Sequence, residues 1–416
     1  MEYGCIGEHL PHSFSREIHE LIENYDYRLR EIERQDLEAF MKEADFRAIN
    51  VTIPYKEAVI PYLAEISPQA RAIGAVNTIV NRNGKLFGYN TDFSGMDALL
   101  RRLGTDPSGK KVLILGTGGT SRTAKALMES HNAREICRVS RRKSAGDPGV
   151  ITYEEAYEKH GDAQIIINTT PVGMFPDTDA CPIDFSAFPN LIAALDAVYN
   201  PLRTLFVQQA ENRKIAAEGG LYMLVAQAVH ASSLFTGKPE REGVTDRIFK
   251  KIRYDKENIV ISGMSGAGKS AVGKALRRIT GRTLVDTDAL IVGKAGKSIP
   301  EIFREIGEEG FRTLETGIIR ELSQKNGIII STGGGAVLRE ENLRELRKNG
   351  RIFFLQRDIS EIEPSPERPL ADTKEKVEAL YRARLPIYLW SADAVVLVKG
   401  TPEDTAQILL KNRLES

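Results

Sequence analysis

The chain has 416 residues, 42% of them hydrophobic and 27% charged, which is an ordinary composition for a globular protein of two or three domains. Lysine plus arginine and aspartate plus glutamate both number 57, so the zero net charge gives no electrostatic reason to expect a nucleic acid or a membrane as a partner. No apolar run is long enough to span a bilayer and residues 1–4 lack the layout of a signal peptide, so we expect a cytoplasmic protein.

The cysteines and histidines do not predict a structural framework. Cys5, Cys137 and Cys181 are scattered, which favours reduced thiols over disulfides. The six histidines show neither HxH nor HExxH spacing, so we expect no dedicated zinc site.

Short β-rich runs alternate with helical patterns along the whole chain, which is typical of the α/β class. The predicted strands of the first 220 residues are 3–7, 48–53, 77–89, 111–115, 134–140, 164–168 and 192–198. Asn83-Gly84 predicts a hairpin within the third strand, and the polar segment 104–110 separates the third strand from the fourth. A helix is expected over 219–235.

The charged stretch 237–258 contains four apolar residues at helical spacing, which predict one amphipathic helix: Val244, Ile248, Phe249 and Ile252. A free linker is therefore expected only at about 254–258. A second α/β unit begins at Ile259 and continues to the end of the chain.

The second unit opens with a phosphate-binding motif. The strand run Ile259–Ile261 leads directly into Gly263–Ser270, which matches GxxxxGK[ST] and is followed by apolar residues at helical spacing. In this context backbone N–H groups and a helix N-terminus bind phosphates, so we expect Lys269 to reach the β- and γ-phosphates of ATP and Ser270 to ligate Mg²⁺. The alternative is a glycine-rich turn without a ligand. The predicted ATP-binding residues of the motif and its flank are Gly263, Ser265, Gly266, Ala267, Gly268, Lys269, Ser270 and Ala271.

More polar residues follow later strands of this unit or lie in its helices and loops: Asp286, Asp288, Arg312, Gly333, Gly334, Gly335, Arg368 and Arg384. Ligands bind at the carboxyl ends of strands in doubly wound sheets. Taken singly, each of these residues has a structural or solvated alternative. As an ordered set behind a P-loop, they resemble shikimate kinase along nearly all of the unit.

That resemblance implies a role for each residue. Asp288 accepts the hydroxyl to be phosphorylated, and Arg312 and Arg384 clamp the substrate carboxylate through their guanidinium forks. The glycines at 333–335 allow close approach of the substrate, Asp286 helps Ser270 to hold Mg²⁺, and Arg368 is the lid arginine that closes on ATP. Lys269, Asp288 and Arg368 form the implied catalytic set. The segment before Arg368 is short and rich in proline, so we expect a reduced lid helix.

The strand 111–115 leads into Gly116, Gly118, Gly119, Thr120 and Ser121, the glycine-rich turn of a dinucleotide-binding unit with serine at the third glycine position. The next strand ends in Ser140-Arg141-Arg142-Lys143 rather than in an acidic residue, and this cationic turn suits the 2′-phosphate of NADP. The alternative is a solvated basic turn.

Several further segments resemble shikimate dehydrogenase, in this order: 12–15 (HSFS), 50–57 (NVTIPYKE), 74–78 (GAVNT), 90–92 (NTD), 168–170 (NTT), 199–202 (YNPL) and 221–227 (LYMLVAQ). The similarity covers essentially residues 1–250. It implies substrate binding by Ser13, Ser15, Thr52, Lys56, Asn77, Asp92, Tyr199 and Gln227, with Lys56 and Asp92 as the catalytic pair. The implied NADP-binding set adds Asn168, Thr169, Thr170, Gly220 and Met223 to the glycine turn and to Ser140, Arg141 and Arg142.

The chemistry of ketone reduction explains why a Lys–Asp pair is suitable. A positioned ammonium can give a proton to the developing alkoxide and stabilise its charge, and a carboxylate can orient the ammonium. An isolated pair of this kind is otherwise a structural salt bridge.

We therefore expect a bifunctional α/β enzyme of the shikimate pathway that uses NADP(H), ATP and Mg²⁺. The expected domains are a substrate domain (1–103, completed by 220–253), a Rossmann-type NADP domain (104–219) and a P-loop domain like that of nucleoside-monophosphate kinases (254–416). The resemblance implies reduction of 3-dehydroshikimate to shikimate and then 3-phosphorylation of shikimate, by a monomer or a homodimer. Two alternatives stay open: the first half uses quinate and NAD, or one half is only a regulatory shikimate-binding module.

Overall fold

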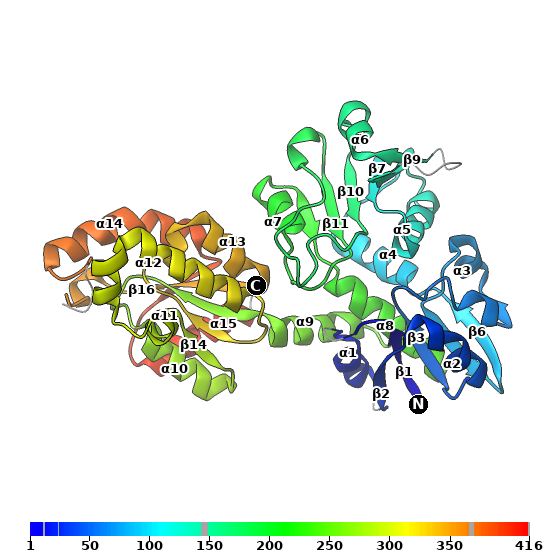
Figure 1. Ribbon diagram of the computed structural model, residues 1–416, viewed down its shortest axis with the longest axis horizontal. Coiled ribbons are helices and arrows are strands. Elements are labelled where there is room, and N and C mark those ends of the chain that lie inside the picture. The colour runs from blue at the N-terminus through cyan, green and yellow to red at the C-terminus, as the bar shows by residue number, and fades with distance from the viewer. Residues whose placement is uncertain (11–12, 24, 143–148, 366–369, 415–416) are drawn as a thin grey trace. The chain divides into compact units, whose positions relative to one another are not determined.

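The computed structural model describes residues 1–10, 13–23, 25–142, 149–365 and 370–414. The chain divides into two compact units, Met1–Arg253 (unit 1) and Tyr254–Ser416 (unit 2), and each contains α/β layers (Figure 1). Within the described ranges, no helix is both long enough and apolar enough to cross a membrane.

Unit 1 begins with a six-stranded sheet in the order β2-β1-β3-β5-β6-β4, parallel except that β5 runs antiparallel to β3 and β6. Its strands are β1 (Tyr3–Gly7), β2 (Tyr27–Glu31), β3 (Ala48–Val51), β4 (Glu65–Ile66), β5 (Thr78–Arg82) and β6 (Lys85–Tyr89). Its helices are α1 (Ser15–Ile22), α2 (Leu37–Glu43) and α3 (Pro68–Ile73). The hairpin expected at Asn83-Gly84 is confirmed, because both residues have positive φ and join β5 to β6.

The second sheet of unit 1 is parallel, in the order β12-β11-β10-β7-β8-β9. Its strands are β7 (Lys111–Leu115), β8 (Glu135–Ser140), β9 (Val150–Thr152), β10 (Ile165–Asn168), β11 (Ala193–Asp196) and β12 (Ala216–Glu218). This is the doubly wound dinucleotide-binding order, whose switch point lies between β7 and β10. The helices are α4 (Asp92–Arg102), α5 (Gly119–Ser130), α6 (Tyr153–Lys159) and α7 (Leu205–Asn212).

Helices cover both faces of this second sheet, and alternate side chains of β7 pack against the two sets of helices. Val112 and Ile114 pack with residues of α4 and α5, whereas Leu113 and Leu115 pack with residues of α6 and α7. A strand buried on both faces needs apolar side chains at every position, which is why the run Lys111–Leu115 is apolar after its first residue.

We call the parts of unit 1 around its first and second sheets the first lobe and the NADP lobe. Helices α8 (Leu221–Thr236) and α9 (Val244–Lys256) pack in the first lobe, where they share a core with Phe14 and Ile18. The amphipathic helix expected in the charged stretch is confirmed, since its four apolar residues are all buried. The free linker expected at about 254–258 is wrong. Helix α9 continues to Lys256 and β13 begins at Asn258, because the backbone of this segment is used in secondary structure almost without a break.

Unit 2 contains one parallel sheet in the order β14-β15-β13-β16-β17. Its strands are β13 (Asn258–Ser262), β14 (Leu284–Asp286), β15 (Ile329–Ser331), β16 (Gly350–Gln356) and β17 (Ala394–Leu397). Its helices are α10 (Lys269–Thr280), α11 (Thr287–Ala295), α12 (Ile299–Ser323), α13 (Glu340–Asn349), α14 (Lys374–Ser391) and α15 (Pro402–Leu414).

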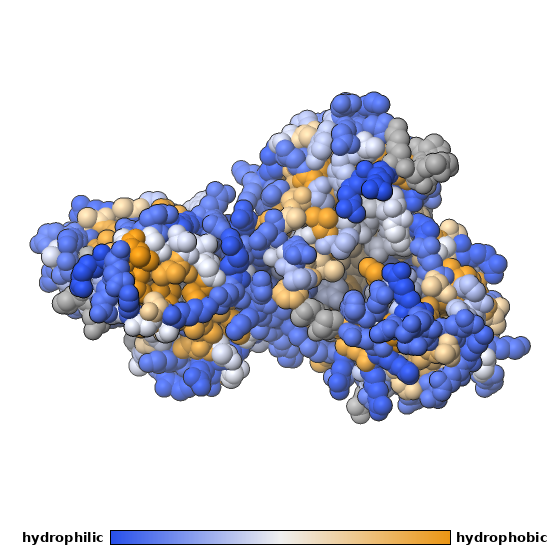
Figure 2. Space-filling view, viewed as in Figure 1, coloured by the Kyte–Doolittle hydropathy of each residue, from blue (hydrophilic) through white to orange (hydrophobic). Residues whose placement is uncertain are grey.

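The central strand β13 is buried on both faces in this unit as well. Val260 packs with residues of α12, α13 and α14, whereas Ile259 and Ile261 pack with residues of α10 and α15. The surface facing the viewer in Figure 2 is mostly hydrophilic, and hydrophobic residues gather on part of unit 2. Trp390 is the most exposed large apolar side chain that the structure describes in unit 2, at 64%, and it lies under the guanidinium of Arg347.

Candidate active sites

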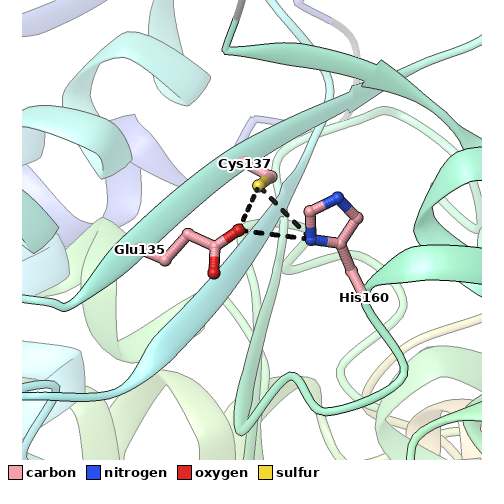
Figure 3. A group of neighbouring side chains, drawn as sticks. All are labelled: Glu135, Cys137 and His160. Carbon is pink, nitrogen blue, oxygen red and sulfur yellow. Dashed lines mark hydrogen bonds and ion pairs between the residues drawn. The ribbon is translucent and has the colours of Figure 1, made fainter.

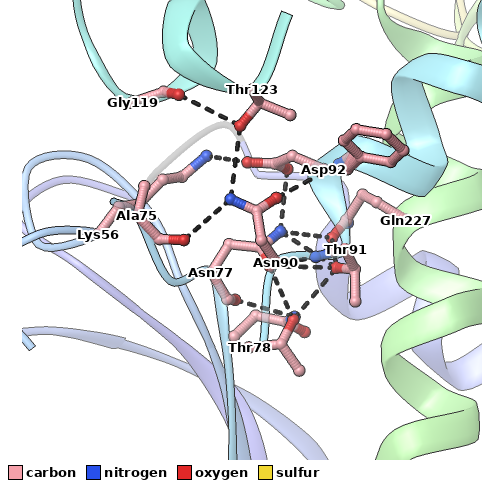
Figure 4. Close-up of polar contacts among 12 residues, drawn as sticks. Lys56, Ala75, Asn77, Thr78, Asn90, Thr91, Asp92, Gly119, Thr123 and Gln227 are labelled. Carbon is pink, nitrogen blue, oxygen red and sulfur yellow. Dashed lines mark hydrogen bonds and ion pairs between the residues drawn. The ribbon is translucent and has the colours of Figure 1, made fainter. Parts of the chain in front are cut away.

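A lysine and an aspartate face each other between the two lobes of unit 1 (Figure 4). Lys56 Nζ donates to Asp92 Oδ2 at 2.5 Å, and both side chains are almost buried. Lys56 lies in the turn after β3, and Asp92 is the first residue of α4. A Cβ built on Gly119, at the start of α5, would lie 3.7 Å from Lys56 Cδ. The glycine turn is therefore in direct reach of the lysine.

Buried amides fix the second oxygen of this carboxylate. Asn77 Nδ2 donates to Asp92 Oδ1 at 2.9 Å, and Asn77 Oδ1 accepts from the Thr91 backbone N–H at 2.7 Å. Thr91 Oγ1 in turn donates to Gln227 Oε1 at 3.2 Å. The sequence predicted Asn77 and Gln227 but not Thr91, which connects them.

A second group of predicted substrate residues lies around the start of α1. The Ser15 N–H donates to Ser13 Oγ at 3.3 Å, and the Ser13 hydroxyl also hydrogen-bonds Tyr199. Burial raises the pKa of Tyr199 to about 12, so the phenol is neutral. The Tyr199 ring packs on Phe14, with 5.2 Å between the ring centroids, so the phenol lies against the residue that precedes α1. His12 of the same motif lies outside the described residues.

Thr52 lies one residue beyond the end of β3 and is half-buried. Its N–H donates to Ile6 O at 2.9 Å, which holds the turn toward Lys56 against β1. A Cβ on Gly7 would lie only 2.7 Å from Thr52 Cγ2, so this close approach requires glycine at position 7.

The predicted cofactor residues gather at the switch point of the second sheet. Gly116 follows β7 with φ +108°, and a Cβ there would lie 2.9 Å from Thr169 Oγ1. Ser121, at the third glycine position, closes the turn by donating to Gly116 O at 2.7 Å. Gly118 and Thr120 flank the first residue of α5, so the helix N-terminus faces the turn. This is the geometry of a pyrophosphate cradle, and the chain fits the cofactor.

The loop after β10 is ordered by a buried aspartate. Asn168 donates to Asp196 Oδ1 at 2.9 Å and accepts from the Thr170 N–H at 3.0 Å. Asp196 Oδ2 also accepts from the Thr204 hydroxyl at 2.6 Å. Burial raises the pKa of Asp196 to about 7 against these hydrogen bonds. Sequence analysis missed Asp196, which belongs to no phosphate-binding motif.

The remaining cofactor residues lie in two places. Arg141 and Arg142 are exposed after β8, with the Arg142 N–H 3.5 Å from Ser140 Oγ, while Lys143 lies outside the described residues. Gly220 precedes α8, and Met223 is buried in the core shared by α4, α5 and β7.

In unit 2, the P-loop follows β13 as expected. Gly263, Gly266 and Gly268 all have positive φ, which turns the loop into the first residue of α10. Lys269 is buried, and its Nζ donates to Gly263 O at 2.9 Å and to Met264 O at 2.8 Å. The other predicted ATP-binding residues lie in this loop or in the first turn of α10: Ser265, Ala267, Ser270 and Ala271.

Ser270 and Asp286 present two oxygens side by side. Ser270 Oγ and Asp286 Oδ2 are 2.9 Å apart, and Asp286 Oδ1 accepts from the first N–H groups of α11. Ligands along one edge of an octahedral magnesium shell of about 2.1 Å radius lie about 2.9 Å apart. The two residues therefore fit Mg²⁺.

Two buried carboxyl groups face the glycine turn at 333–335. Asp288 Oδ1 and Glu315 Oε1 are buried and have no hydrogen-bond partner among the residues that the structure describes, and a Cβ on Gly333 would lie 2.6 Å from each. Burial raises the pKa of both carboxyls. Two unpaired buried acceptors are costly unless a ligand donates to them, so this point is suited to a hydroxyl-bearing ligand.

The predicted arginines border the same space. Arg312 Nη1 donates to Glu315 Oε2 at 2.8 Å, and its guanidinium fills the volume where a Cβ on Gly335 would lie. Arg384 Nη1 donates to Gly334 O at 3.3 Å, and the Tyr388 hydroxyl donates to the same carbonyl. Glu315 and Tyr388 were not predicted, although their positions one turn from Arg312 and Arg384 on α12 and α14 were a signal.

The predicted lid arginine, Arg368, lies outside the described residues. Among the described residues between β16 and α14, regular structure is limited to one 3₁₀ turn, Ile359–Glu361. Arg357 was not predicted, yet its Nη1 lies 3.7 Å from where a Cβ on Gly268 would be. It is a cation beside the P-loop.

Comparison with known proteins gives matches in both units. A family model described as "Shikimate dehydrogenase substrate binding domain" matches residues 5–79, and one described as "Shikimate kinase" matches residues 265–413. A shikimate dehydrogenase (NADP(+)) of Clostridium perfringens strain SM101 is 36% identical over 266 residues, which cover 60% of this chain and 98% of the relative.

Solved structures of shikimate dehydrogenases also match a large part of the chain. Shikimate dehydrogenase 1 of Peptoclostridium difficile has a TM-score of 0.57 and 34% identity, covering 61% of this chain and 98% of that one. Shikimate 5-dehydrogenase of Thermus thermophilus, solved with NADP(H) and shikimate, has a TM-score of 0.55 and 29% identity, covering 60% of this chain and 99% of that one.

Proposed function

The chain belongs to the shikimate dehydrogenase family and carries a shikimate kinase domain, and from this premise we propose that one polypeptide catalyses two consecutive reactions. Unit 1 reduces 3-dehydroshikimate to shikimate with NADPH, and unit 2 transfers the γ-phosphate of ATP to the 3-hydroxyl of shikimate. One observation carries the proposal: the Lys56–Asp92 pair lies against Gly119 of the cofactor turn, so a proton donor stands where a reduced cofactor would be bound.

In the reductase site, Lys56 gives the proton to the oxygen of the substrate ketone. Bound NADPH supplies the hydride for this reaction. Asp92 accepts a hydrogen bond from Lys56 and keeps the ammonium pointed at the substrate, while Asn77 prevents rotation of the carboxylate. A general acid in this position contributes about 10²- to 10⁴-fold to the rate.

The substrate is held on both sides of this pair. Ser13 and Ser15 bind its carboxylate, since Ser13 Oγ accepts from the Ser15 N–H at the start of α1. Thr52, Asn77 and Gln227 bind the ring hydroxyls, and the neutral Tyr199 closes the carboxylate end.

The cofactor is held at the switch point. The glycine turn, Asn168, Thr169 and Thr170 bind the pyrophosphate and the ribose next to it, Gly220 and Met223 border the nicotinamide, and Ser140, Arg141 and Arg142 bind the 2′-phosphate. The last assignment favours NADP over NAD, because two exposed guanidinium groups replace the acidic residue that a free 2′-hydroxyl requires.

In the kinase site, Asp288 receives the proton of the 3-hydroxyl as the phosphoryl group is transferred. Its raised pKa and its unpaired Oδ1 suit that task. Lys269 contacts the β- and γ-phosphates, Ser270 and Asp286 would hold Mg²⁺, which would neutralise phosphate charge, and Arg368, outside the described residues, is the predicted lid arginine. Arg312 and Arg384 clamp the substrate carboxylate, and Gly333, Gly334 and Gly335 leave room for its ring.

We also propose the division into a substrate domain (1–103 with 220–253), an NADP domain (104–219) and a kinase domain (254–416), in a monomer or a homodimer. Assays on the purified chain with shikimate or quinate, and with NADP⁺ or NAD⁺, test the first half. Assays of shikimate-dependent ADP release test the second. Faster turnover of quinate with NAD⁺ would overturn the assignment of the first half, and a unit without activity would reduce it to a binding module.

A further inference from the structure

Three potential metal ligands meet in the NADP lobe, away from the residues assigned above (Figure 3). Glu135 and Cys137 lie two positions apart on β8, so both side chains point to the same face of the sheet. His160 is the residue that ends α6. Their ligand atoms, Glu135 Oε1, Cys137 Sγ and His160 Nδ1, all lie within 4.8 Å of one another.

The separations of these atoms are those of ligands around one small ion. Glu135 Oε1 lies 3.6 Å from Cys137 Sγ and 3.4 Å from His160 Nδ1, and Sγ lies 3.7 Å from Nδ1. In a tetrahedral zinc site, with bonds of about 2.3 Å to sulfur and about 2.0 Å to nitrogen or oxygen, neighbouring ligand atoms lie about 3.3 to 3.6 Å apart. The three atoms therefore need to move by little more than 0.1 Å.

We propose that Glu135, Cys137 and His160 form a zinc-binding site, with water as the fourth ligand. Sulfur, imidazole nitrogen and carboxylate oxygen are a ligand set that selects zinc over Mg²⁺ or Ca²⁺. The Glu135 side chain is 42% exposed, so this side of the site borders solvent. On binding, the S–H bond of Cys137 breaks, a sulfur–zinc bond forms and the proton goes to water.

The neighbouring lysine contacts the other oxygen of Glu135, not the one that faces the thiol and the imidazole. Lys111 Nζ contacts the other oxygen of Glu135, Oε2, at 3.2 Å and also contacts Asp162 Oδ1 at 2.8 Å. Asp162 thus offsets the charge of Lys111, while Oε1 of Glu135 stays directed at the thiol and the imidazole. A bound ion would tie the first residues of β8 to the end of α6. Ser140 is at the other end of β8, so the role is structural and is independent of the proposed enzyme activities.

The histidine spacing in the sequence does not predict this site. The imidazole and the thiol are 23 positions apart and come from a helix end and a strand, so only the packing of α6 against β8 brings them together. The expectation of no dedicated zinc site rested on the spacing of histidines within single segments, and these three ligands come from two segments.

Cobalt(II) added to the full-length, reduced chain without nucleotide tests the proposal, because a cobalt–thiolate bond gives an intense charge-transfer band that the oxygen ligands of the kinase site cannot give. We expect one equivalent to bind, zinc to displace it, and Cys137→Ser and His160→Gln to lose the band. Cys181→Ser removes another thiol of the same lobe and should keep it. Absence of the band, its persistence in Cys137→Ser or its loss in Cys181→Ser would overturn the proposal.

A second measurement covers the case in which a core variant does not fold. Glu135→Gln changes a half-exposed side chain and should weaken zinc binding, measured by competition with a chromogenic chelator, at least tenfold. Zinc should also raise the unfolding temperature of the wild-type chain more than that of Glu135→Gln. Equal affinity and equal thermal shifts in the two proteins would refute the site. Dehydrogenase activity without added metal should be the same in both, which verifies folding.

Discussion

Lys56 Nζ lies 2.5 Å from Asp92 Oδ2, and the other oxygen of the same carboxylate accepts from Asn77. The carboxylate is thus held at two points and fixes the ammonium, while the aliphatic part of the Lys56 side chain lies against the glycine turn. A structural salt bridge does not need this second anchor, nor a position beside a nucleotide cradle. This arrangement supports the proposed role of Lys56 as the proton donor.

Replacing the proton donor should stop one reaction only. Lys56→Met keeps most of the unbranched side chain but removes the ammonium, so kcat of the dehydrogenase should fall at least about 10²-fold. Phosphorylation of shikimate by the same preparation should be unchanged. Steady-state assays of both activities measure this. Lys42→Met removes an exposed lysine that pairs with Glu38 and should leave both activities intact. A dehydrogenase that keeps its rate without Lys56 would contradict the assignment.

The P-loop lysine should give the opposite result. Lys269→Ala removes the cation that contacts Gly263 O and Met264 O, so kinase kcat should fall about 10²- to 10³-fold. NADPH oxidation should continue at the wild-type rate. The control is Lys274→Ala, a change five residues further along α10. Loss of both activities in folded Lys269→Ala protein would show that the two sites depend on each other.

Glu315 should act through Arg312. Glu315→Gln breaks a buried ion pair and lets the guanidinium turn toward Glu308, which already contacts it at 3.2 Å. We expect the KM for shikimate to rise about tenfold, with a smaller change in kcat, since a displaced arginine weakens substrate binding. Glu308→Gln is the matched control, because that carboxylate is half exposed, and it should change KM less than about twofold. An unaltered KM in Glu315→Gln would exclude the positioning role.

Asp196 should make the stability of the NADP lobe depend on pH. Its folded pKa, about 7, lies above its ordinary value of 3.8, so its contribution to stability is fully present below the lower value and is lost as the pH rises through the upper one. From pH 7 down to pH 5, wild type should gain stability relative to Asp196→Asn by about 1 kcal/mol per pH unit, with little further change above about pH 8.

Calorimetry from pH 5 to 8.5 measures this difference in the transition that NADP⁺ shifts upward. Asp184→Asn serves as the control, since Asp184 is exposed and its pKa is lowered by the hydrogen bonds of its own turn. A difference between wild type and Asp196→Asn that stays constant over the whole range would mean that Asp196 is ionised throughout.

The parts of the fold that could be predicted from sequence are those with strong local signals. The strands Tyr3–Gly7 and Lys111–Leu115 match their predicted bounds, because a strand covered on both faces is a continuous apolar run. Strand β2, which reads YRLRE, was missed, since it lies at the edge of its sheet and exposes most of its side chains.

The candidate sites show the same division. Lys269 was predicted from the spacing of its phosphate-binding motif, whereas Lys56 and Asp288 were predicted from the resemblance to known families. Asp196 and Glu315 were missed, because each contacts residues that only the fold brings close. Asp196 accepts from Asn168 in the loop after β10, and Glu315 pairs with Arg312 beside the glycine turn. Their signal is burial of charge, which a sequence does not display.

The most direct test of the account is a single reaction that contains the purified chain, 3-dehydroshikimate, NADPH, ATP and Mg²⁺, with products followed by mass spectrometry. The account predicts that shikimate appears first and shikimate 3-phosphate then accumulates, with one NADPH and one ATP consumed for each molecule formed. Shikimate that accumulates without phosphorylation, or phosphate transfer without any reduction of 3-dehydroshikimate, would contradict the claim that one chain catalyses both steps.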